Sequence, residues 1–258
     1  MKINKVSLVG MVAGCLLAVA AASASSVQTI NIALFEYPPF LDEKAKDYGL
    51  EPAIVRAAFK RVNVAVNYTF MPAARALVGT AKGDFQATVG WVKTDEREQD
   101  FYFSDAIAEA PLVFFHLKSV PFDWKTYDDL KGVLIGTVNK YNYGPGFQAA
   151  LVAGTIQVDE AGRDESNFRK LLLGRNAVTP VNLYVGYKII QETFDPATAR
   201  LFTHHPVPLK MSVHHVLFPK SLSDSYANSA LFNQGLQKIM ASGEYKKIVN
   251  AYRLKKPK

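Results

Sequence analysis

The stretch "TINIALFEYPPFLDEKAKDYGLEPAIVRAAFKRVNVAVNYTF", residues 29–70, changes its hydrophobic period twice. Residues 29–35 form a short β-rich run that ends in the turn-forming "EYPPF". Apolar residues then recur at helical spacing from Ile54 to Val62, and residues 63–70 alternate at the spacing of a strand. We therefore expect a strand, a helix and a second strand here.

The same alternation continues along the chain. "PAARALVGTAKG" predicts a helix with Pro72 in its first turn and Gly83 at its end, and "DFQATVGW" predicts the next strand. A second run of strands and helices covers residues 133–193. The connection rules then give parallel or mixed sheets flanked by helices, which is an α/β fold. Two runs of similar size joined near residues 116–124 predict two lobes, and the cleft between such lobes is where small ligands bind.

The first residues are typical of a secretory signal. Two lysines precede an uncharged apolar run, and "ASA" at residues 22–24 offers a cleavage site, so we expect residues 1–24 to be removed. "VAGC" resembles a lipidation motif, but the residues after Cys15 stay hydrophobic, which makes a lipoprotein the weaker interpretation. Cys15 is the only cysteine, so burial rather than disulfides must stabilise the mature chain.

Several function classes lack support in the sequence. The net charge of +7 is spread out and forms no basic stripe, so we expect no nucleic-acid partner. There is no G-x-S-x-G, no H-E-x-x-H, no phosphate-binding glycine loop and no paired-cysteine site, and we expect no cofactor. The histidine pairs at 204–205 and 214–215 could each offer only one imidazole to a metal, because adjacent side chains of a strand face opposite sides. We therefore expect no metal site.

Arg97 is the strongest candidate for ligand binding. It lies in "GWVKTDEREQDFYFSDAI", residues 90–107, just after a predicted strand whose end would face the cleft. An arginine there can hold a carboxylate through two parallel hydrogen bonds. The alternative is a surface ion pair with one of its acidic neighbours, and composition alone leaves both interpretations open.

Five segments, in order, resemble the family 3 extracellular solute-binding proteins, the periplasmic receptors of polar amino acid transporters. They are "YPPF", "LEPAIVRAAFKRV", "TDERE…FSDAI", "YDDLKGVLIGTV" and "GEYKKIVNAY". The resemblance implies a hinged, two-lobed type II binding protein with lobe 1 at 25–117 and 212–258 and lobe 2, inserted, at 118–211. It also implies a small-molecule ligand, an inner-membrane ABC permease as partner, a periplasmic location and a monomer.

The resemblance implies roles for particular residues. Arg97 corresponds to the arginine that binds the α-carboxylate of the ligand, and Tyr37 to the aromatic that packs on the ligand side chain. The acid that usually binds the α-ammonium group falls at Asn182, which carries no charge. Gly90 and Trp91 stand where hydroxyl residues are common, and Trp91 is either a stacking wall or a core residue. These departures indicate a divergent branch of the family.

Further candidates come from the expected cleft. Arg75, early in a helix, is either a second cation for an anionic ligand or a solvated residue. The loop "NKYNYGPGF" offers Asn139, Tyr141, Asn142 and Tyr143 for hydrogen bonds or stacking, or is merely structural. Glu36 would be the acid or base of a dehydratase-like enzyme on the same scaffold, although no second titratable partner is evident. A solute sensor without a transport role is the third interpretation.

Overall fold

The computed structural model describes residues 27–139 and 141–252. The expected signal segment, residues 1–24, and Cys15 within it lie outside the described residues. None of the described helices is both long and apolar enough to cross a membrane.

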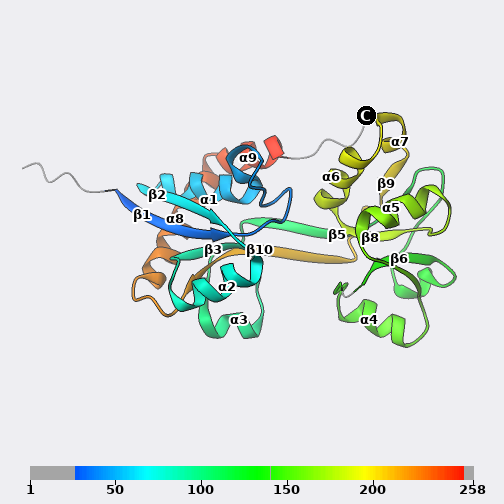
Figure 1. Cartoon of the computed structure of the whole chain (residues 1–258), viewed down its shortest axis with the longest axis horizontal. Helices are drawn as coiled ribbons and strands as arrows, with labels where there is room; N and C mark the ends of the chain where they lie inside the picture. Colours follow the sequence, from blue (N-terminus) through cyan, green and yellow to red (C-terminus); the bar gives the residue numbers. More distant parts are fainter. Residues whose placement is uncertain (1–26, 140, 253–258) are drawn as a thin grey trace, which may run out of the picture.

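Lobe 1 is built on the parallel strands that the opening stretch predicts. Strand β1 (Gln28–Leu34) lies between β2 (Val64–Phe70) and β3 (Ala87–Val92) and is parallel to both. Helix α1 (Leu50–Lys60) connects β1 to β2, and α2 (Ala73–Lys82) connects β2 to β3. Figure 1 shows these two helices on opposite faces of the sheet. The remaining elements of this lobe are η1 (Lys46–Tyr48), α3 (Asp95–Asp100), β4 (Phe101–Phe103), α8 (Ser225–Ala241) and α9 (Glu244–Tyr252).

Two long strands run from one lobe into the other. Strands β5 (Ala108–Leu117) and β10 (Lys210–Pro219) pair antiparallel, and Figure 1 shows them bridging the two bodies of the molecule. Strand β10 also pairs with β3 and β4 in lobe 1, whereas β5 pairs with β8 (Thr179–Asn182) and β9 (Phe202–His204) in lobe 2. The resulting sheet is mixed, because β10 is antiparallel to the parallel β1–β3 set.

Lobe 2 has a smaller parallel pair of strands and its own helices. Strand β6 (Leu134–Val138) is parallel to β7 (Gln157–Ala161). Helices α5 (Asp164–Leu172) and α6 (Leu183–Thr193) pack against each other. The other elements of this lobe are η2 (Tyr127–Leu130), α4 (Pro145–Val152), β8, α7 (Pro196–Ala199) and β9. The expected α/β class with mixed sheets flanked by helices is confirmed.

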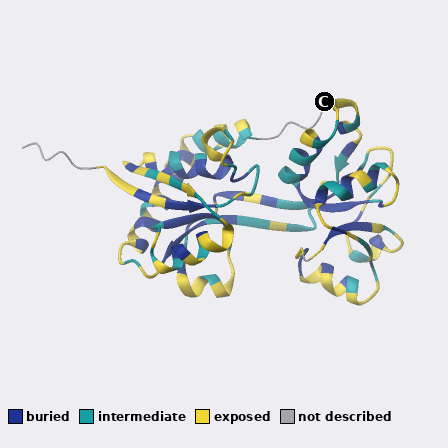
Figure 2. Cartoon of the chain, viewed as in Figure 1, coloured by how far each residue is buried: buried dark blue, intermediate teal, exposed yellow. Residues whose placement is uncertain are grey.

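Each lobe has its own hydrophobic core (Figure 2). Strand β5 contributes Ala108 and Ala110 to the core of lobe 1, and Val113 and Phe115 to a core of lobe 2. This change of environment along one strand supports the proposed division into two lobes. We propose that β5 passes from lobe 1 to lobe 2 at Pro111, which pairs with Met211 of β10. Pro111 lies six residues before the lobe boundary that the sequence predicts at residue 117.

Candidate functional site

A cavity of about 220 Å³ lies between the two lobes, beside the crossing strands. Both lobes and both crossing strands line it. The lining residues are Tyr37, Val92, Ala110, Leu112, Tyr141, Asn142, Asp164, Pro180, Val181, Asn182, Val185, Lys210, Ser212 and His214. This inter-lobe cavity therefore contains four of the candidate residues from the sequence, namely Tyr37, Tyr141, Asn142 and Asn182.

Tyr37 forms the aromatic wall on the side of lobe 1. It follows β1, and its ring stacks on Phe40 with the centroids 5.4 Å apart and lies 5.9 Å from the ring of His214. Burial, with smaller contributions from Glu51, Tyr141 and Asp164, raises the pKa of Tyr37 to about 12. The phenol is therefore neutral at physiological pH and can both donate and accept a hydrogen bond.

His214 reaches the same cavity from β10 and is held by a buried acid. Its Nδ1 lies 2.6 Å from Oε1 of Glu51, and both side chains are buried. This contact uses Nδ1, so Nε2 is the nitrogen left for another partner. The pair joins α1 to the crossing strand and fixes the orientation of the imidazole.

Gly90 makes room for this pair. Its φ of +89° lies in the region that favours glycine, and a Cβ there would lie 2.7 Å from Cδ1 of Leu41 and 3.0 Å from Oε2 of Glu51. Strand β10 shifts its register opposite this position, between His215 and Val216, which is the pattern of a β-bulge. Gly90 therefore does not line the cavity, but its lack of a side chain leaves space for Glu51, which holds His214.

The wall on the side of lobe 2 carries two polar residues with different roles. Asn182 caps α6, because its side-chain oxygen accepts from the amides of Tyr184 (3.0 Å) and Val185 (3.3 Å). Only its NH₂ group remains to meet a ligand. Asp164, the first residue of α5, is 9% exposed, and its Oδ1 is buried without a partner among the described residues. Burial raises the pKa of Asp164 to about 6.

Sequence reasoning missed Asp164 as a site residue. "DESNF" is typical of the start of a helix, and an acid in the first turn has a sufficient local explanation there. Lys210 and Ser212 were missed too, because the resemblance places a lobe boundary at 211/212 but does not indicate that the side chains beside it line the cavity. Asp164, Lys210 and Ser212 come to line one cavity only because segments far apart in the chain lie together in the fold.

Arg97 lies next to the inter-lobe cavity, outside its lining. The guanidinium donates to the backbone oxygen of Val92 (2.7 Å) and lies over the ring of Trp91, 4.9 Å from its centroid. Among the described residues Arg97 forms no ion pair, and the neighbouring Glu98 pairs instead with Lys93. The acidic neighbours are therefore not what holds Arg97.

Trp91 is a core residue with one ring face turned to Arg97. It is 9% exposed, packs with Phe101 and Leu217, and donates from Nε1 to the hydroxyl of Thr88 (2.9 Å). A cation over an indole ring is attracted to it, so the ring holds the guanidinium in place. Trp91 therefore contributes to the site through Arg97.

Three further candidates lie outside the inter-lobe cavity. Arg75 is exposed on α2, and Asn139 is exposed in the turn after β6. Glu36 is exposed and accepts a hydrogen bond from the amide of Glu43 (3.1 Å). The structure thus brings Tyr37, Tyr141, Asn142 and Asn182 together around one cavity, whereas Arg75, Asn139 and Glu36 lie elsewhere.

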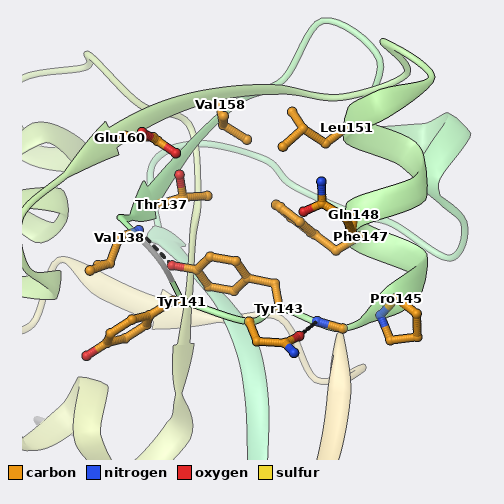
Figure 3. Close-up of a pocket in the computed structure, with 12 residues that line it drawn as sticks. Thr137, Val138, Tyr141, Tyr143, Pro145, Phe147, Gln148, Leu151, Val158 and Glu160 are labelled. Carbon is orange, nitrogen blue, oxygen red and sulfur yellow. Dashed lines mark hydrogen bonds between the residues drawn. The ribbon is translucent and has the colours of Figure 1, made fainter.

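Lobe 2 contains a separate cavity of about 480 Å³ (Figure 3). It lies between α4, β6 and β7, and the loop at residues 141–144 separates it from the inter-lobe cavity. Tyr143 fixes this loop, because its hydroxyl accepts from the amide of Val138 (2.7 Å), as Figure 3 shows. Burial raises the pKa of Tyr143. Tyr141 and Asn142 line both cavities.

The described part of the chain holds no group of three or more His, Cys, Asp or Glu residues that could bind a metal ion. His214 and His215 are adjacent on β10 and bind different partners. Whereas His214 meets Glu51, Nδ1 of His215 lies 2.8 Å from the backbone oxygen of Ser104.

Two α/β lobes, a pair of crossing strands and a cavity between the lobes define a two-lobed solute-binding protein. The sequence model of the bacterial extracellular solute-binding proteins, family 3, matches residues 30–255, so the chain belongs to this family. The resemblance noted in the sequence is thereby confirmed.

Solved structures agree with the fold. The chain is similar to a probable amino-acid ABC transporter extracellular-binding protein, ytmK, of Bacillus subtilis, with a TM-score of 0.72 and 19% identity over 88% of this chain and 98% of that one. It is also similar to substrate-binding domain 2 of Lactococcus lactis GlnP, with a TM-score of 0.68 and 21% identity over 87% and 95% of the two chains. It is similar as well to an ancestral arginine-binding protein bound to arginine, with a TM-score of 0.62 and 20% identity over 88% of this chain and 98% of that one. No curated protein matches the sequence.

Proposed function

We propose that this chain is the periplasmic substrate-binding component of an ABC transporter, and that it binds a small polar solute bearing a carboxylate, an amino acid or a related organic acid. The observation that carries this proposal is the cavity of about 220 Å³ that both lobes line beside the crossing strands. Its volume suits a small solute, and membership of the solute-binding family supports the same role. Transport is favoured because similar structures bear the names of ABC transporter components.

The ligand carboxylate binds Arg97 and the cavity cation Lys210. The guanidinium uses one nitrogen for the backbone of Val92, so its other N–H groups remain available for a carboxylate. Lys210 lines the cavity directly and forms no ion pair with any described residue. When the lobes close on the ligand they exclude water, which strengthens both contacts, and the ligand stabilises the closed state by its greater affinity for it.

The remaining parts of the proposal follow from the sequence and the family. Residues 1–24 direct the chain to the periplasm and are removed. The mature protein acts as a monomer that delivers its ligand to an inner-membrane permease. The ligand is bound and released without chemical change.

The test uses the chain without residues 1–24 in a thermal-shift screen of amino acids and organic acids. We expect at least one solute to raise the unfolding temperature, since a ligand that binds only the folded state stabilises it. Arg97→Ala is expected to weaken that solute about 10- to 100-fold in titration calorimetry, the usual effect of losing a hydrogen bond to a charged group. Arg75→Ala, on an exposed helix face outside the cavity, is the matched control. A screen without any stabilising solute, or an Arg97→Ala variant with unchanged affinity, contradicts the proposal.

A further inference from the structure

The carboxyl group of Asp164 is the unsatisfied acid of the inter-lobe cavity. The residue is 9% exposed, and its Oδ1 is buried without a hydrogen-bond partner in the described part of the chain. By contrast, the half-buried Glu165 and the exposed Asp129 and Asp195 all accept hydrogen bonds from neighbouring groups. A buried carboxylate without a partner costs several kcal/mol, so its retention beside a cavity indicates a partner that arrives from outside.

Among the described residues, none forms an ion pair with Asp164. Lys210 lines the same cavity but forms no ion pair with Asp164. Its aliphatic side chain packs close to Gly144 in the loop of lobe 2, because Cδ of Lys210 would lie 3.7 Å from a Cβ added at Gly144. Nδ1 of His214 is already hydrogen-bonded to Glu51. The side-chain oxygen of Asn182 is an acceptor that its own helix occupies, and its NH₂ group carries no charge.

The surroundings of Asp164 favour a cationic partner. Tyr37 and Tyr141 line the same cavity and lie within electrostatic range of the carboxylate, which contributes to raising the pKa of each phenol. Two neutral aromatic rings beside one carboxylate form a surface that attracts a positively charged nitrogen, because ring faces are negative. An anionic group placed there would instead be repelled.

We propose that Asp164 binds a cationic nitrogen of the ligand, an ammonium or guanidinium group, and thereby selects nitrogen-bearing solutes over organic acids that lack one. This inference rests on the proposed function and narrows its substrate class. Asp164 supplies the negative charge that Asn182 lacks, from the start of α5. Lys210 in the cavity and Arg97 beside it remain for a carboxylate, so the site suits a solute with both charges.

The experiment compares two groups of compounds on the mature protein by titration calorimetry. The first group is the twenty L-amino acids, putrescine and glycine betaine, and the second is succinate, citrate and L-lactate. We expect the best binder to carry a cationic nitrogen and to bind at least about tenfold more tightly than its own 2-hydroxy acid analogue, since a charge-assisted hydrogen bond is lost. This comparison uses the wild-type chain, so it does not depend on the folding of a variant.

Three variants then locate the contact. Asp164→Asn is expected to weaken the best binder about 10- to 100-fold and to reduce its preference over the hydroxy analogue. Glu165→Gln removes a charge one residue further along α5, from an acid that pairs with Arg169, and is expected to leave the affinity unchanged. Tyr37→Ala is expected to weaken binding of any cavity ligand.

The outcomes separate this inference from the proposed function. If only compounds of the second group bind, or if Asp164→Asn binds as tightly as wild type while Tyr37→Ala is weakened, the Asp164 inference is overturned and the binding function stands. If no compound of either group binds, both are overturned.

Discussion

Replacing Asp164 with asparagine should stabilise the unliganded protein at neutral pH. Burial in the inter-lobe cavity raises the pKa of this carboxyl from 3.8 to about 6, so the folded protein disfavours its ionised form. A pKa change of this size corresponds to about 3 kcal/mol. Because the asparagine amide also lacks a partner there, we expect a net gain in the free energy of unfolding of about 1–3 kcal/mol at pH 7.5. For a chain of this length that corresponds to roughly 2–12 °C in the unfolding temperature.

The pH dependence gives the sign of this effect. Between pH 3.8 and about 6 the folded protein binds more protons at Asp164 than the unfolded chain does, so the wild type loses stability as the pH rises through this window. Above about pH 6 the wild type bears the full free-energy cost of burying the ionised Asp164 carboxylate, and near pH 4 this cost is largely absent. The advantage of Asp164→Asn should therefore shrink towards zero at pH 4. Lys210, His214, Tyr37 and Tyr141 face the same cavity and are present in both proteins, so the difference between the two curves isolates Asp164.

The assay is urea unfolding of wild type, Asp164→Asn and Glu165→Gln at pH 7.5 and pH 4. Glu165 accepts hydrogen bonds from Arg169, which lower the pKa of its carboxyl, so Glu165→Gln should bring no gain at pH 7.5. An Asp164→Asn variant that is no more stable than wild type at pH 7.5, or whose gain is the same at both pH values, would refute the reasoning that this carboxylate is buried and unpaired.

Three further predictions concern the groups around the cavity. Gly90→Ala should lower the free energy of unfolding by about 2–4 kcal/mol in urea titrations, because the new methyl group would lie 2.7 Å from Leu41 in a backbone conformation that disfavours alanine; a loss below 0.5 kcal/mol would contradict this. His214→Ala should lower the free energy of unfolding by about 1–3 kcal/mol, since it leaves the buried Glu51 carboxyl without its hydrogen-bond partner, and adding Glu51→Gln should recover part of the loss; independent, additive effects in this double-mutant cycle would disprove the coupling. Lys210→Met should weaken a carboxylate ligand roughly tenfold in calorimetry, and an unchanged affinity would remove this lysine from the site.

Much of lobe 1 follows from local sequence patterns. The hydrophobic period changes from that of a strand to that of a helix and back within residues 29–70, and β1, α1 and β2 lie there. Helix α2 begins after Pro72 and ends at Gly83. Proline favours the start of a helix, and glycine readily adopts the left-handed backbone conformation that ends one. These elements are predictable because each depends on residues within one turn or one strand.

The crossing strands are not predictable in this way. Strand β5 passes from one core to another at Pro111, so its burial does not repeat with a single period along its length. Strand β10 begins half-exposed at Lys210 and ends fully buried near Phe218. Their role depends on pairing between segments about a hundred residues apart, which local patterns do not encode.

The candidate site shows the same limit. The aromatic Tyr37 could be proposed through the family resemblance, which implies an aromatic ligand contact at this position, and Tyr37 lines the cavity. Arg97 was ambiguous because its neighbours in the sequence are acids, whereas its neighbours in space are Val92 and Trp91. Asp164 has the sequence context of an ordinary helix start, whereas its burial beside the cavity is a feature of the folded chain that the local sequence does not indicate.

The most direct test of the account is whether the solute binds between the lobes or in the separate cavity of lobe 2. Ser212→Trp places an indole in the inter-lobe cavity, and Gln148→Trp places the same group in the cavity of lobe 2. Titration calorimetry with the best-binding solute should show loss of binding in Ser212→Trp and wild-type affinity in Gln148→Trp. The opposite result, with binding retained in Ser212→Trp and lost in Gln148→Trp, would contradict the central claim.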